Sequence, residues 1–255
     1  MHFAKILKTT LIAVAGCCTP VMADVSVNWQ TTTDQLSLEV LQRSNVISDF
    51  TQLIDKHFIS TEDYKLEELK VTINDEQKPY ANIESNELVI PYHYLTYAIK
   101  SHAELEETRE AALERAINTV EFTLYHLFGL LIAKDNDPDS DDTAEAVSSW
   151  LMIKAFGNGG EQWFADAEAF GRASQLLDGP LTDYWHEHAL YKSRQRKINC
   201  WILGSSPERY EDLLKPVLEQ QQRTERCTDE WNQLDLEMQQ LLRQNIVTGS
   251  RLLNN

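Results

Sequence analysis

Apolar and polar residues alternate in short segments of the first hundred positions. The alternation covers residues 36–40 and 69–73, and Glu87–Pro91 is a third short extended run. Because successive side chains of a strand point to opposite faces, each segment is predicted to be a β-strand. Residues 46–58 carry apolar side chains at helical spacing and are predicted to form a helix. This part of the chain is therefore expected to be α+β.

After Ser101 the apolar positions recur every three or four residues. They fall at Leu113, Ile117, Val120, Leu124, Leu127 and Leu131. This spacing predicts one long amphipathic helix that ends near Ala133. The apolar spacing and the capping residues predict further helices from Asp139 or Ser140 to Phe156, over residues 161–177, from Pro207, and from near Thr228.

The predicted fold class is α+β, with a small N-terminal strand layer followed by a mainly helical half. We find no internal repeat and no low-complexity linker, so residues 24–255 are expected to form a single domain. The 255 residues are 42% hydrophobic, which is enough for an ordinary core. No run of about 20 apolar residues occurs, which excludes a multi-span membrane protein. The net charge of −17 argues against binding to nucleic acid.

The first 23 residues have the organisation of a signal peptide. Lys5 and Lys8 precede an apolar stretch, and Val21-Met22-Ala23 is a small-x-small cleavage pattern. Cleavage after Ala23 would give a periplasmic or secreted protein. The segment ending at Cys17 also resembles a lipobox, and in that alternative a lipid on Cys17 would anchor the protein to a membrane.

Two cysteines remain after removal of the signal peptide. Cys200 and Cys227 form an even pair in an oxidising compartment, and a disulfide between them is the natural prediction. A redox pair or a thiolate metal site is the alternative, but the Cys-x-x-Cys spacing and a nearby histidine are both missing.

The long helix and the helix after it carry a set of polar residues that could support chemistry. His126 lies in the apolar part of the long helix, and Asp141 and Glu145 lie in the first turns of the next. This arrangement resembles a bacterial family of exported proteins of unknown function, classed as candidate zinc metallopeptidases with a gluzincin-like site. In that family one helix carries H-E-x-G-H and the following helix carries E-x-x-A-D. Two histidines and an acid of the second helix would bind zinc, and the glutamate between the histidines would activate water.

The resemblance covers roughly residues 66 to 245. Besides the two helices it includes Tyr184–Leu190, Cys200–Pro207, and Arg226-Cys227 followed by Glu230. The resemblance implies a zincin-like helical half and a metallopeptidase-like activity.

The chain departs from the family pattern at the residues that would do the chemistry. His126 and Gly129 match the first histidine and the glycine, but Leu127 replaces the general-base glutamate and Leu130 replaces the second histidine. Asp141 takes the place of the ligand glutamate. Glu145 takes the place of the acid that supports the ligands. At most His126 and Asp141 remain as metal ligands, so no catalytic residue and no cofactor are predicted.

The same residues also have purely structural explanations. His126 could be a hydrogen-bonded core residue, and Asp141 could be a first-turn acid that complements the helix dipole. His186 and His188 are two residues apart, so a helix would point them to different faces.

The sequence therefore predicts an exported metallopeptidase-like protein that is catalytically inactive and binds a peptide or a partner in the cell envelope. An active zinc-dependent peptidase with an atypical site is the alternative, and it would recruit His186 or His188 and an Asp or Glu from elsewhere, with Glu187 as one candidate.

Overall fold

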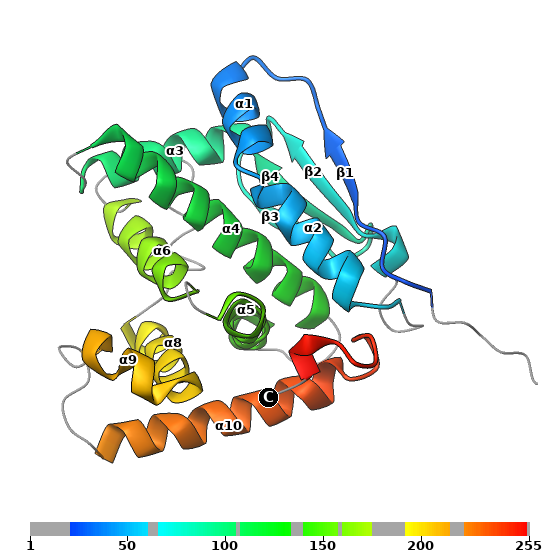
Figure 1. Cartoon of the computed structure of the whole chain (residues 1–255). Helices are drawn as coiled ribbons and strands as arrows, with labels where there is room; N and C mark the ends of the chain where they lie inside the picture. Colours follow the sequence, from blue (N-terminus) through cyan, green and yellow to red (C-terminus); the bar gives the residue numbers. More distant parts are fainter. Residues whose placement is uncertain are drawn as a thin grey trace, which may run out of the picture.

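The computed structural model describes residues 21–60, 66–105, 108–133, 140–157, 160–174, 192–214 and 222–253. A small mixed sheet near the N-terminus lies beside a larger group of helices (Figure 1). The α+β prediction is confirmed.

The sheet has four strands in the order β1-β2-β4-β3. They are β1 (Ser26–Trp29), β2 (Lys70–Asn74), β3 (Tyr80–Asn82) and β4 (Glu87–Pro91). β1, β2 and β4 are parallel to their neighbours, while β3 pairs antiparallel with β4 at one edge. The last four residues of both β2 and β4 are buried, so the centre of the sheet is covered on both faces. The predicted strands at 69–73 and 87–91 are confirmed.

Three helices belong to the same part of the chain, namely α1 (Gln35–Arg43), α2 (Val46–His57) and α3 (Tyr92–Ala103). The predicted helix at 46–58 is confirmed as α2. The predicted strand at 36–40 is wrong, because these residues lie in α1.

Local capping explains the error at α1. A side-chain oxygen of Asp34 accepts a hydrogen bond of 3.0 Å from the backbone N–H of Ser37, which fixes the start of the helix. Ser37 and Leu41 are the buried residues of α1, whereas Leu36 is 65% exposed. The buried face therefore follows a spacing of four residues, and the alternating pattern at 36–40 does not reflect burial.

The remaining helices are α4 (Arg109–Ala133), α5 (Ser140–Phe156), α6 (Gly160–Ser174), α8 (Lys192–Ser205), α9 (Pro207–Leu214) and α10 (Gln222–Leu242). Short 3₁₀ turns occur at Leu66–Glu68 (η1) and Arg251–Leu253 (η2).

The predicted helix ends at Ala133 and Phe156 and the predicted helix start at Pro207 are confirmed. The start near Thr228 is wrong, because α10 already begins at Gln222. The Thr228 hydroxyl donates to the carbonyl of Thr224 within the helix and does not cap it.

Helix α4 is the central helix of the fold (Figure 1). It packs against α2, α3, α5 and α6 and against strands β3 and β4. Its length and hydropathy alone would allow it to cross a membrane, and it is the one such helix in the described part of the chain. However, 83% of its most apolar window is buried inside the protein, as expected for a core helix.

Candidate metal centre between helices α4 and α5

Helices α4 and α5 come very close to each other at Gly129. A Cβ atom added there would overlap the backbone oxygen of Ala144 and lie 2.8 Å from its Cα atom. Only a glycine allows the two backbones to come this close. Because His126 is one turn before Gly129 and Glu145 directly follows Ala144, this contact fixes the part of the fold in which the predicted site would lie.

His126 is buried in the middle of α4, with 5% of its surface exposed. Its ring stacks on that of Phe122, which lies one turn earlier, with the centroids 6.3 Å apart and the planes at 13°. The imidazole therefore packs within the core, which lowers the number of orientations open to it.

The two predicted acids belong to the first turns of α5. Glu145 is buried, with 3% of its surface exposed. The backbone of Asp141 lies in α5, but its side chain is outside the described part of the structure, as are His186, Glu187 and His188. The structure thus places His126 and Glu145 on two helices in contact, and leaves the geometry of Asp141 undescribed.

The side chains at the two substituted positions, 127 and 130, are hydrocarbon. Leu127, which the sequence resemblance aligns with the general-base glutamate, is fully buried in the hydrophobic core. Leu130, which the resemblance aligns with the second histidine, is partly buried against that core. A hydrolytic zinc site needs three protein ligands and a water molecule. Among the described residues, no group of three or more His, Cys, Asp or Glu could hold a metal ion. The described residues at the family positions therefore do not fit a zinc ion.

The sequence reasoning missed two polar residues on the same helix, Glu121 and Tyr125. Glu121 is buried, and desolvation together with the nearby carboxylate of Asp49 raises its pKa to about 7. The Tyr125 hydroxyl is buried without a hydrogen-bond partner in the described part of the chain. Burial, with the negative charges of Glu121 and Asp49, raises the Tyr125 pKa further above its usual value.

The tyrosine ring of this pair is held by aromatic contacts. The Tyr125 ring packs edge-on against Phe50 at 5.2 Å and against Phe156 at 5.9 Å between centroids. A lone acid at position 121, in an otherwise apolar stretch, was the available sequence signal for this pair. That Asp49 of α2 comes close to it could only be learned from the fold.

The other described histidines make structural hydrogen bonds. His57 Nδ1 lies 2.8 Å from the Ser250 hydroxyl, and His102 Nε2 lies 2.9 Å from the Thr119 hydroxyl. His93 Nε2 lies 2.8 Å from a backbone carbonyl. Burial lowers the His102 pKa to about 4, so this ring is neutral at physiological pH.

Cys200 and Cys227 join α8 to α10. Cys200 and Cys227 form a disulfide with their Cα atoms 4.8 Å apart. One turn after Cys200, a Cβ added to Gly204 would overlap the carbonyl of Cys227 and lie 2.9 Å from Cβ of Trp231. The segment Cys200–Pro207 thus supplies both the covalent link and the close helix contact, which explains why a glycine follows the cysteine at this spacing.

A comparison with protein-family models matches residues 27–242 to the family described as "Putative metallopeptidase". Searches of curated proteins and of solved structures gave no match. The match extends from the second residue of β1 to the last residue of α10 and includes both the α4–α5 contact and the disulfide. The chain therefore belongs to this metallopeptidase family.

Proposed function

We propose that this metallopeptidase-family protein binds an extended peptide, or the extended segment of a partner in the cell envelope, without hydrolysing it. The observation that carries the proposal is Leu127, which is fully buried and which the sequence resemblance aligns with the family's general base. A buried leucine can neither activate water nor accept its proton. The partly buried Leu130 offers no metal ligand in place of the second histidine.

The edge of the sheet next to α4 supports the binding role. Strand β3 pairs with β4 on one side and packs against α4. No further described strand pairs with its other side. An unpaired strand edge can add a peptide as an additional strand, with main-chain hydrogen bonds supplying the affinity. A peptide bound there would run beside the helix that carries His126.

We also propose that the protein is exported. The order of basic, apolar and small residues before Asp24 supports this, and a disulfide is compatible with an oxidising compartment. Cleavage after Ala23 would release the chain into the periplasm or the medium, and a lipid on Cys17 would anchor it in a membrane.

Peptide binding and hydrolysis can be tested together. The probe is a fluorescein-labelled pool of unstructured peptides of about eight residues, and the control is the same pool with alternate peptide nitrogens methylated, which removes half of the main-chain donors. We expect the anisotropy to rise for the first pool and not for the second, and the peptides to stay intact in mass spectrometry after incubation with added zinc. Cleavage that is lost in His126→Ala would show an active peptidase. Equal binding of both pools would exclude pairing at a strand edge.

A further inference from the structure

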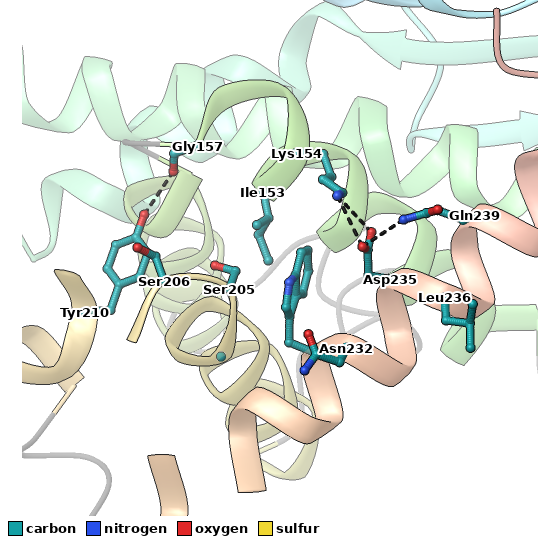
Figure 2. Close-up of a pocket in the computed structure, with 12 residues that line it drawn as sticks. Ile153, Lys154, Gly157, Ser205, Ser206, Tyr210, Asn232, Asp235, Leu236 and Gln239 are labelled. Carbon is teal, nitrogen blue, oxygen red and sulfur yellow. Dashed lines mark hydrogen bonds and ion pairs between the residues drawn. The ribbon is translucent and has the colours of Figure 1, made fainter. Parts of the chain in front are cut away.

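A groove opens between the C-terminal part of α5, the junction of α8 with α9, and one face of α10 (Figure 2). Its volume is about 740 Å³, within the range of sites that hold small molecules. Most of the side chains that line it are polar. It lies at the opposite end of α5 from Glu145, because Lys154 comes nine positions after Glu145, or about 13.5 Å along a helix axis. The groove is therefore distinct from the α4–α5 site.

The groove is built around a buried carboxylate, Asp235 of α10. Asp235 accepts a hydrogen bond of 2.6 Å from the indole N–H of Trp150 and one of 2.8 Å from the amide of Gln239. The ammonium group of Lys154 lies 3.0 Å from one of its oxygens and 3.3 Å from the other. These contacts hold the Lys154 and Gln239 side chains at the groove, as Figure 2 shows.

The carboxylate and the ammonium group balance each other's charge. Both side chains are nearly buried, so their pairing leaves this part of the groove close to neutral. Neutrality disfavours phosphates and other charged ligands, which need an excess of the opposite charge.

Several polar groups of the groove keep hydrogen-bonding capacity for a ligand. Gln239 donates one N–H to Asp235 and retains a second N–H and its carbonyl oxygen. The side chains of Asn232 and Ser206 have no hydrogen-bond partner among the described residues. Asn232 and Gln239 are seven residues apart on α10 and so face the same side of the helix. The groove thus offers amide and hydroxyl groups that can both donate and accept.

We propose that this groove binds a neutral saccharide. Sugar hydroxyls both donate and accept hydrogen bonds, which matches the amides of Asn232 and Gln239 and the hydroxyl of Ser206. Trp231, of which 8% is exposed, also lines the groove and can offer a small apolar contact to the C–H groups of a sugar ring. A lipid would leave the polar groups unpaired, at a cost in free energy for each.

The segment Cys200–Pro207 has no role at the α4–α5 site, but it forms one wall of this groove. Gly204, Ser205 and Ser206 of that segment line the groove. The Cys200–Cys227 disulfide and the close contact at Gly204 hold this wall against α10, which carries Asn232 and Gln239. A preorganised wall of this kind lowers the entropy cost of binding.

The binding test uses the whole disulfide-bonded protein labelled with ¹⁵N, titrated with chitotriose and, separately, with maltotriose. The side-chain amide signals of Asn232 and Gln239 should shift with saturation in at least one titration. Asn232→Ala and Gln239→Ala should each weaken binding roughly tenfold, the expected effect of one lost hydrogen bond to a ligand. Gln233→Ala is the matched control, because this exposed side chain on α10 bonds to Glu237 and does not line the groove; it should bind as the wild type does.

Three results would overturn the proposal. The first is that neither sugar shifts the two amide signals at millimolar concentration. The second is that binding is unchanged in both Asn232→Ala and Gln239→Ala while the fold is intact by circular dichroism. The third is that tri-alanine amide shifts the same signals and the sugars do not, which would make the groove a peptide site.

Discussion

Glu121 is an acid placed in the most apolar part of the central helix. It is 8% exposed, with Val120 and Phe122 as buried neighbours. Its raised pKa of about 7 means that the folded state holds the proton more tightly than an unfolded chain, for which the usual value is 4.5. The contribution of Glu121 to stability is therefore fully present below pH 4.5 and is lost as the pH rises to about 7.

Replacing this acid should flatten the pH dependence of stability. We expect Glu121→Gln to leave the free energy of unfolding nearly unchanged at pH 4.5 and to raise it by up to about 3 kcal/mol at pH 8, because the amide carries no charge to bury. Urea denaturation at the two pH values measures the difference. Glu114→Gln, an exposed acid on the same helix, should show no such change between the two values. An equal effect of both substitutions at pH 8 would contradict the assignment to burial.

At the candidate site, some residues could be predicted from the sequence and others could not. His126, Leu127 and Leu130 could be identified from motif spacing, because a helix puts positions i and i+4 on one face. The burial of Leu127 was expected, because it is one of the apolar positions that recur every three or four residues along this helix. The approach of Asp49 to Glu121 is a contact between α2 and α4, and no local pattern predicts such a contact.

At the scale of elements, the contact between α4 and α5 depends on one missing side chain. We expect Gly129→Ala to destabilise the protein by roughly 3 kcal/mol, because the new methyl group would meet backbone atoms of Ala144 that cannot move without shifting α5. Thermal unfolding followed by circular dichroism measures the loss.

A second glycine provides the control for this substitution. Gly157 has a φ of 51°, but nothing lies near its missing Cβ atom. Gly157→Ala should therefore cost only the conformational penalty of about 1 kcal/mol. If Gly129→Ala costs no more than Gly157→Ala, the close packing of α4 on α5 is not a stabilising feature.

The disulfide between α8 and α10 should make a comparable contribution. It closes a loop between residues 27 positions apart, and the chain-entropy relation gives about 3.5 kcal/mol for a loop of this length. The Cys200→Ala/Cys227→Ala variant should melt at a lower temperature than the wild type, and a reducing agent should lower the melting temperature of the wild type but not of the variant. Two free thiols in unreduced protein from the cell envelope would argue against the bond in the native protein.

Helices and strands that bury an apolar face could be predicted from the sequence. Those that depend on a local polar cap or on pairing with a neighbouring strand could not. The period of three and four identified α4, and the short apolar runs identified β2 and β4. Strand β3 has three residues and exists because β4 pairs with it, so its own sequence carries little signal. Helix α1 was mistaken for a strand because its cap at Asp34 outweighs an accidental alternation.

At the scale of the whole molecule, the first described residues lie against the fold. The backbone N–H of Ala23 donates to the carbonyl of Phe58 at 3.2 Å, and the N–H of Ser60 donates to the carbonyl of Val21 at 2.8 Å. Cleavage after Ala23 would remove both bonds and would leave β1, which starts at Ser26, in place.

The export proposal predicts the start of the mature chain. Intact mass and N-terminal sequencing of protein from the cell envelope should give Asp24 as the first residue, or a lipid-bearing Cys17 in the anchored form. Recovery of the whole chain from Met1 in the cytoplasm would contradict export, and with it the expectation of an oxidising compartment.

The match over residues 27–242 shows that the chain belongs to the metallopeptidase family, and we propose that its metal chemistry is lost. The most direct test is the zinc content per chain, by inductively coupled plasma mass spectrometry, of protein purified without chelator. We expect the wild type to hold no stoichiometric zinc, and Leu127→Glu/Leu130→His/Asp141→Glu to bind it more tightly, provided that the variant still unfolds cooperatively. One tightly held zinc per wild-type chain that is lost in His126→Ala would contradict the account.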